Sequence, residues 1–298
     1  MEWDFRRLLL LVFLVNHRII GILKKIEKIK KRMKKISSVL ALLLIMQLMS
    51  CSSDDDGINN GGGIIDLDSF TALNVGDNIN LVLRYGANQE VELTGDGNLN
   101  KVDLFVDNDV LFVSDLSPDA SNVVVIVESP DINSIVVENN GILNFDNAFE
   151  TSFDELNIVG FDAAEIYNEY AMRVSILDVR LENAAKMALL DLDADELYVD
   201  LQDGSRCTLE GFATDQYISL INGCRLNLDF PYNEWEATNP IQGVNCTITA
   251  DDGGNGWVQA SNYLEATADN GTRIYYQGTP NQENFTELNG GEIVQKDN

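Results

Sequence analysis

A corner-like motif recurs about every 20 residues in the second half of the chain. Each copy places Asn, Asp or Gln before Gly or Ala: Asn140-Gly141, Asp162-Ala163, Asn183-Ala184, Asp203-Gly204, Asn222-Gly223, Gln242-Gly243 and Asn270-Gly271. The spacings are 22, 21, 20, 19, 20 and 28 residues. A repeat of this length is typical of solenoids. Asx residues tolerate the left-handed backbone conformation and Gly adopts it freely, so these pairs suit tight corners.

Apolar residues alternate on both sides of the corners, which predicts strands. The apolar positions before a corner include Leu177, Val179, Leu181, Leu197, Val199, Leu201, Ile218 and Leu220. Those after a corner include Met187, Leu189, Cys207, Leu209, Leu226, Leu228, Cys246 and Ile248. One such coil cannot bury its own apolar side, but coils stacked about 4.8 Å apart can, with their backbones paired in parallel.

The region from Asp66 to the first corner also alternates, for example in Ile79–Leu83, Val102–Val106 and Val123–Val127, and shows no helix pattern of three turns. We therefore predict one all-β body over residues 64–298. It is a solenoid with coils of about 20 residues, preceded by N-terminal strands of the same body. The long last spacing predicts a loop near Pro231–Pro240 or Asp251–Gly256.

Charge is divided unevenly along the chain. Residues 1–50 hold 11 of the 20 Lys and Arg residues but 3 of the 48 Asp and Glu residues, which leaves a net charge of about −36 in residues 51–298. So acidic a body repels phosphate backbones and argues against nucleic-acid binding. The single histidine, His17, lies in the basic leader. The body therefore lacks the histidine of Ser-His-Asp and Cys-His nucleophile systems and of His-liganded metal sites.

Residues 1–50 have the features of a leader with a signal peptide. Met33-Lys34-Lys35 precedes a largely apolar run, Ile36 to Met49, which is short for a membrane span. Leu48-Met49-Ser50-Cys51 resembles a bacterial lipobox, which implies cleavage before Cys51 and a lipid on its sulfur. The alternative is an ordinary secretory signal with an incidental cysteine. Residues 1–32 are either a long basic extension or the product of a start assigned too far upstream.

Residues 51–63 form a polar, Gly-rich tether that contains the acidic run Asp54-Asp55-Asp56. Such a run close to a lipidated cysteine resembles the surface-export signal of Bacteroidetes lipoproteins. We therefore predict an outer-membrane lipoprotein on the cell surface, held through its anchor at Cys51. The alternative is the periplasmic face.

Two stretches of the body resemble the bacterial head GIN domain family, described as auto-transporter adhesins. The first runs from Phe70 to Ser114 and includes Asn78-Ile79-Asn80-Leu81 and a Tyr85-Gly86 turn. The second is Asn270-Gly271-Thr272-Arg273-Ile274-Tyr275-Tyr276-Gln277-Gly278-Thr279-Pro280. The resemblance covers most of residues 64–295. It implies a right-handed β-helix-like body on an exported protein, and it brings no catalytic residues.

Basic residues recur three positions after the corner Asx, at Lys186, Arg206 and Arg225, in a series that also includes Glu165, Asn245 and Arg273. Stacked on consecutive coils, they would form a cationic ladder for an acidic glycan or a carboxylate. The simpler interpretation, which we favour, is charge balance with neighbouring acids.

Acidic residues recur in a second approximate register, at Glu169, Asp191, Glu210, Asp229 and Asp251. Like charges about 4.8 Å apart invite a cation such as Ca²⁺, but the chain lacks the fixed ligand spacing of a calcium loop. We favour solvated surface acids, with no metal and no cofactor.

We predict that three cysteines of the body, Cys207, Cys224 and Cys246, are buried small apolar residues. Cys207 and Cys246 would occupy equivalent positions two coils apart. A Cys207–Cys224 bridge is the less favoured alternative. Aromatic residues near the C-terminal end could stack on sugars or, as we favour, seal the end of the solenoid: Trp235, Trp257, Tyr263, Tyr275 and Tyr276.

Together these features predict a noncatalytic cell-envelope protein, an adhesin or a scaffold that binds a carbohydrate or a partner protein. The alternatives are a carbohydrate-active β-helix enzyme, either a polysaccharide lyase or a glycoside hydrolase, and a structural envelope accessory. An enzyme would need a groove where a base and acids converge. Uncapped ends would also permit a homo-oligomer.

Overall fold

The computed structural model describes residues 63–95, 98–116, 122–228 and 239–296. The predicted leader, Cys51 and almost all of the tether lie outside the described residues, as do Asp229 and Trp235. Residues 58–298 form one compact unit.

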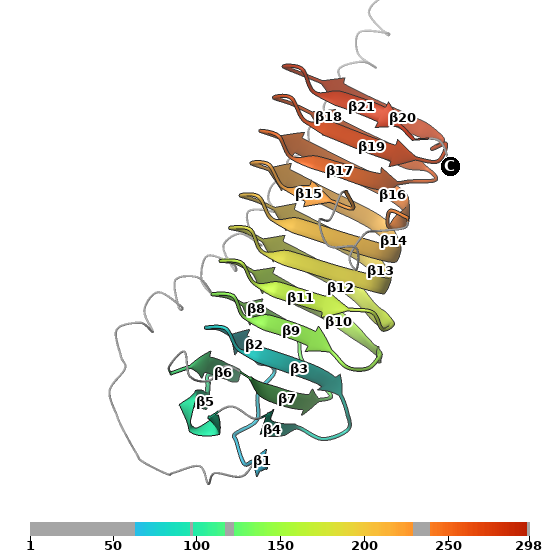
Figure 1. Cartoon of the computed structure of the whole chain (residues 1–298). Coiled ribbons are helices and arrows are strands. Elements are labelled where there is room, and N and C mark those ends of the chain that lie inside the picture. The colour runs from blue at the N-terminus through green and yellow to red at the C-terminus, as the bar shows by residue number, and fades with distance from the viewer. Residues whose placement is uncertain (1–62, 96–97, 117–121, 229–238, 297–298) are drawn as a thin grey trace, which may run out of the picture. The chain divides into compact units, whose positions relative to one another are not determined.

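The described residues form a single 21-stranded sheet, interrupted by one short 3-10 turn at Leu99–Lys101 (Figure 1). The prediction of an all-β body is confirmed. No helix within the described ranges is long and apolar enough to cross a membrane.

The N-terminal strands form a mixed part of this sheet. They are β1 (Ile64–Ile65), β2 (Ala72–Val75), β3 (Asn80–Tyr85), β4 (Glu90–Gly95), β5 (Val102–Asp107), β6 (Val110–Asp115), β7 (Val123–Ser129), β8 (Ser134–Val137) and β9 (Ile142–Phe145). Strand β4 pairs antiparallel with β1 and β7, and β5 pairs antiparallel with β6. Strands β2 and β3 pair in parallel with β8 and β9, so they join this end to the repeats.

The repeats form the rest of the body. Their strands are β10 (Phe149–Gly160), β11 (Glu165–Asn168), β12 (Met172–Leu181), β13 (Lys186–Leu201), β14 (Arg206–Ile221), β15 (Arg225–Leu226), β16 (Gln242–Asp251), β17 (Asn255–Gln259), β18 (Tyr263–Ala268), β19 (Arg273–Gln277), β20 (Gln282–Glu287) and β21 (Glu292–Gln295). Equivalent strands pair in parallel: Glu165 lies opposite Lys186, and Lys186 opposite Arg206. Residues that lie one sequence repeat apart are therefore direct partners on neighbouring strands.

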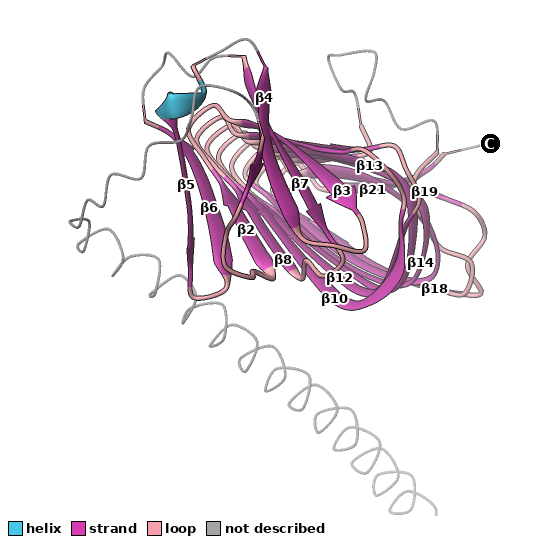
Figure 2. Ribbon diagram, turned by 90° about the horizontal axis from the view of Figure 1, so that it is seen from below, coloured by secondary structure: helices cyan, strands magenta, loops and turns pink. Residues whose placement is uncertain are grey.

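The corners are built from two successive residues with positive φ. Asn183 and Ala184 have φ values of 52° and 64°. The Ala184 N–H donates to the Asp203 carbonyl oxygen of the next repeat at 3.1 Å, and the Asn183 amide donates to the Asp162 carboxylate of the preceding repeat at 2.9 Å. Corners thus stack through backbone and side-chain hydrogen bonds, and they line up in a row in Figure 2.

Two predicted corners are wrong in detail. Gln242 and Gly243 lie at the start of β16, and the corner of that coil is Asp252-Gly253, with φ values of 47° and 79°. The chain inserts extra residues between β15 and β16, so counting 20 residues from Asn222 reaches the wrong point. Most of the first predicted loop, Pro231–Pro240, lies outside the described residues. At Asn140-Gly141 the left-handed residues are Asn139 and Asn140.

The core consists of rows of apolar side chains that run across the paired strands of successive repeats. One row joins Ile158, Val179, Val199, Ile218, Ile248 and Ala266, all buried. Each large aliphatic side chain buried in this way contributes roughly 1.5–3 kcal/mol. Cys207, Cys224 and Cys246 are buried free thiols, as predicted. However, Cys246 pairs with Gln216 and Cys207 with Leu226, so they do not occupy equivalent positions; the same insertion explains this error.

Candidate functional site

The structure brings the three predicted basic residues together on one face. Lys186 pairs with Arg206, and Arg206 pairs with Arg225, at the starts of β13, β14 and β15. The same register continues through Asn255 to Arg273. Asn245 is not in it, because Asn245 pairs with Asp215 and Tyr263 on another side of the coil.

The positive charge of Lys186 is balanced by Glu165, its partner in the same register. The Lys186 ammonium nitrogen lies 2.6 Å from Glu165 Oε1, and the two side chains are 27% and 37% exposed. An ion pair this exposed contributes about 1 kcal/mol or less to stability. Charge balance therefore accounts for part of the basic face at Lys186.

The predicted acidic register is only partly assembled. Glu169 follows β11, Asp191 lies in a bulge of β13 between Leu189 and Leu192, and Glu210 follows Leu209 in β14. Asp251 lies elsewhere, since it pairs with Ile221 beside an Asx corner and accepts a 2.7 Å hydrogen bond from Asn270. Asp229 is outside the described residues. Within the described part of the chain, no group of three or more His, Cys, Asp or Glu residues is arranged to hold a metal ion.

The predicted aromatic residues divide into two groups. Tyr276 is buried and packs against Phe285, with ring centroids 5.2 Å apart, so it helps to cover the end of the core. Trp257 and Tyr275 instead pair on the outer side of β17 and β19. Tyr263 lies on β18, where its hydroxyl donates to Glu265 at 3.1 Å.

Sequence reasoning missed a pair of stacked tyrosines, Tyr198 and Tyr217, on β13 and β14. Their ring centroids are 4.9 Å apart and the planes differ by 16°. Burial, together with the charges of Asp215 and Glu196, raises the pKa of the Tyr217 hydroxyl. Because 19 residues separate the tyrosines, the repeat itself was the signal that could have found them.

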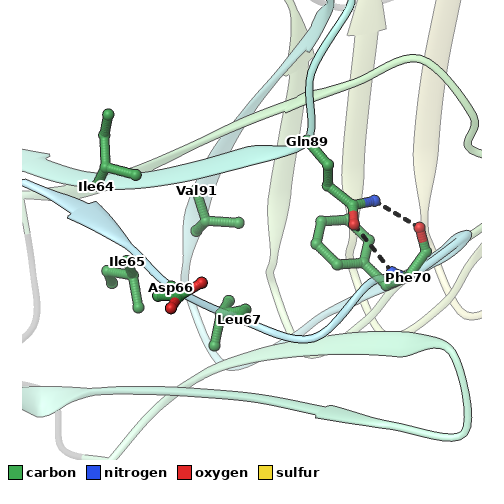
Figure 3. A pocket seen from close by; sticks show the side chains of 7 residues that line it. All are labelled: Ile64, Ile65, Asp66, Leu67, Phe70, Gln89 and Val91. Atoms are coloured by element: carbon green, nitrogen blue, oxygen red, sulfur yellow. Dashed lines mark hydrogen bonds between the residues drawn. The ribbon is translucent and has the colours of Figure 1, made fainter.

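A hollow of about 290 Å³ lies at the N-terminal end of the body (Figure 3). It is lined by Ile64, Ile65, Asp66, Leu67, Phe70, Gln89 and Val91. The Gln89 amide is engaged by the backbone of Phe70, donating to its carbonyl at 2.6 Å and accepting from its N–H at 3.1 Å. Among the described residues that line this hollow, Asp66 is the one titratable residue, so these residues do not bring together the base and acids that an enzyme would need.

Comparison with known proteins identifies one sequence family. Residues 69–280 match the family described as "Putative auto-transporter adhesin, head GIN domain". No curated protein matches the chain.

Three solved structures with a similar fold come from Parabacteroides. A "putative adhesin" from Parabacteroides merdae ATCC 43184 is 19% identical, with a TM-score of 0.65 over 80% of this chain and 96% of that one. A "putative lipid binding protein" from Parabacteroides distasonis ATCC 8503 is 12% identical, with a TM-score of 0.68 over the same shares of the two chains. A "putative adhesin" from the latter strain is 18% identical, with a TM-score of 0.66 over 79% and 96%. At these identities the likeness concerns the fold.

Proposed function

The chain belongs to the head GIN domain family of "putative auto-transporter adhesin" proteins, and from this premise we propose that it is a noncatalytic adhesin of the cell envelope. The family supports an exported, adhesin-like protein. In our proposal, the leader directs export, a lipid on Cys51 anchors the chain in the outer membrane, and residues 51–63 hold the body at the cell surface. One acyl chain binds a membrane weakly, so stable anchoring would require two or more.

We further propose that the body is a right-handed β-helix-like solenoid that works as a rigid scaffold. The parallel register of successive repeats and the stacked corners support this description. A scaffold of this kind presents side chains of successive coils at a regular spacing of about 4.8 Å. It therefore suits a ligand that is itself extended.

The proposed binding face is the basic register of Lys186, Arg206 and Arg225. The observation that carries this proposal is their alignment on three neighbouring strands of a body that has nine basic residues in all. Arginine suits carboxylates because its planar fork can donate two parallel hydrogen bonds. The ligand would be an acidic glycan or a carboxylate-bearing envelope partner.

A glycan-array screen of the detergent-solubilised full chain, with and without Ca²⁺, tests this function. We expect retention of acidic glycans without release of unsaturated or reducing ends. Replacing Arg206 and Arg225 with Gln should weaken retention about tenfold or more, since charged hydrogen bonds contribute roughly 1.5–3 kcal/mol each. Arg173→Gln is the matched control, because Arg173 lies on β12 outside the basic register. Released products would overturn the noncatalytic proposal, and retention unchanged by the double substitution would overturn the proposed face.

A further inference from the structure

Trp257 and Tyr275 place two aromatic rings side by side near the C-terminal end of the body. The residues are direct partners in the parallel pairing of β17 with β19. Both alternate with buried neighbours, Val258 and Ile274, so their side chains lie on the outer side of the strands. The rings are only partly exposed.

A cation of the same chain covers both rings. The Lys296 ammonium nitrogen lies over the Trp257 ring at 4.4 Å from its centroid and over the Tyr275 ring at 4.5 Å. A cation prefers the face of an aromatic ring over its edge. The two ring faces are therefore turned outward, under a side chain close to the end of the chain. The stacked rings of Tyr198 and Tyr217 differ, because there the facing ring surfaces cover each other.

The indole of Trp257 also has an unused hydrogen-bond donor. Its Nε1 is buried and has no hydrogen-bond partner among the described residues. A buried donor without an acceptor costs about 1–3 kcal/mol, so a ligand that supplies an acceptor regains that energy. The Lys296 ammonium cannot do so, because it has three donors and no acceptor.

These observations define the chemistry of a ligand that would fit the two rings. It needs a flat apolar face for the two rings, a hydroxyl or ring oxygen that accepts from Trp257, and little negative charge, since residues 51–298 carry a net charge of about −36. A neutral pyranose has all of these properties, whereas a cation lacks the acceptor. We propose that Trp257 and Tyr275 form a binding site for a neutral hexopyranose unit, and that Lys296 covers this site and is displaced when the sugar binds.

This inference rests on the proposed noncatalytic binding role, but it does not depend on the basic register. It adds a second contact for a sugar chain, at another place on the outer surface. A neutral unit at Trp257 and Tyr275 and an acidic unit at Arg206 and Arg225 would be recognised separately. The two sites can therefore be tested one at a time.

Tryptophan fluorescence reports directly on this site. In a full-length Trp3→Phe/Trp235→Phe background, Trp257 is the single tryptophan of the chain. We expect a saturable shift of its emission on titration with methyl β-glucoside, methyl β-galactoside or methyl α-mannoside. Lys296→Gln should tighten binding about fivefold or more, because it removes a cation that competes for two ring faces.

Three further variants separate the site from its surroundings. Tyr275→Leu should weaken binding about tenfold or more. Trp257→Phe keeps a ring but lacks the N–H donor, and calorimetry should show weaker binding of the same glycoside. Tyr198→Leu is the matched control, an outer-face aromatic on another strand, and should leave the affinity unchanged.

Two results would overturn the inference: no saturable change with any of the three glycosides in Lys296→Gln, or tighter binding when Lys296 is present. Its failure is distinguishable from failure of the proposed function. Acidic-glycan retention that is lost in the Arg206/Arg225 variant but kept in Tyr275→Leu would leave the adhesin proposal standing and remove only this site.

Discussion

At the scale of single residues, the side chain of Asn227 bridges two strands of the sheet at the point where β15 ends. Strand β15 ends at Leu226, and Asn227 has a left-handed backbone with a φ of 56°. Its side-chain oxygen accepts from the Leu209 N–H at 2.7 Å, and its amide nitrogen donates to the Trp257 carbonyl at 3.1 Å. One amide side chain therefore takes the place of the backbone that β15 would have supplied between β14 and β17.

Asn227→Gly isolates this contribution, because glycine accepts the positive φ but makes neither hydrogen bond. We expect a loss of about 1–3 kcal/mol in the free energy of unfolding, since a buried backbone N–H is left without an acceptor. Urea denaturation measures it. An Asn227→Gly chain as stable as the unchanged one would show that water replaces the bridge.

This residue also shows where sequence reasoning stops. The alternation of apolar residues located the buried rows correctly, from Leu177 to Leu220, because the period of a strand is local. The role of Asn227 depends instead on which strands lie on either side of it in space. That arrangement follows from the insertion after β15, whose length the repeat does not reveal.

At the scale of elements, strand β20 carries charged residues at positions that face the core in the strands before it. Glu283, Phe285 and Glu287 of β20 pair with the buried Leu264, Ala266 and Ala268 of β18. They therefore occupy positions that face the core in the preceding coils, yet all six residues of β20 are exposed. Charged residues at inward positions are a known means of preventing edge strands from pairing with other molecules. We infer that Glu283 and Glu287 stop further strands from adding to this end.

Glu283→Val/Glu287→Val should convert the end coil into an extension of the core. We expect concentration-dependent self-association that the unchanged chain shows less strongly, measured by analytical ultracentrifugation. The matched control is Asn284→Val/Thr286→Val, which adds the same side chains at the alternate positions of β20. If both double variants associate equally, added hydrophobicity explains the effect and inward charge does not.

Strands β17 and β19 correct the sequence-based expectation that the aromatic residues seal the end of the core. Tyr276 does help to cover the core, but Trp257 and Tyr275 lie on the outer side and cover nothing inside. Aromatic composition near a chain end could not separate these two roles. The alternation along β19 separates the two roles, because Ile274 and Tyr276 are buried and Tyr275, which lies between them, is on the outer side.

At the scale of the whole molecule, three thiols are held in the core of a body that we propose is exported. Burial raises the pKa of Cys224 and of Cys246 to about 12, and raises that of Cys207 as well, from an ordinary value of 9.0. The folded state therefore favours the protonated thiol more strongly than the unfolded state does. This contribution to stability is complete below pH 9.0 and is lost as the pH rises from there toward 12.

We expect the free energy of unfolding to fall by about 1 kcal/mol per thiol between about pH 8 and about pH 10. Urea denaturation at the two pH values measures the fall. The control is Cys207→Ala/Cys224→Ala/Cys246→Ala, which retains every tyrosine and Cys51. Its pH dependence should be shallower, and equal slopes for the two proteins would contradict the assignment to the thiols.

The sequence predicted the architecture of the molecule better than the contacts between side chains on its surface. Repeats and alternation are local and identify an all-β stack. The basic register was found because Lys186, Arg206 and Arg225 lie one repeat apart in the chain. Lys296 over Trp257 could not be found in this way. Trp257, Tyr275 and Lys296 lie on or directly after β17, β19 and β21, and they meet only when these three strands have paired.

The pairing of successive strands also determines how the body would bear tension. Strands β14, β16, β18 and β20 are each bonded to the next. Traction between the two ends would therefore pull across the ladder and along its hydrogen bonds, not lengthwise along the strands. The exposed coil of β20 and β21 would peel away first, while the coils beneath stayed in place as a template on which it could close again. Under load, the described strands would yield one repeat at a time, beginning with β20 and β21.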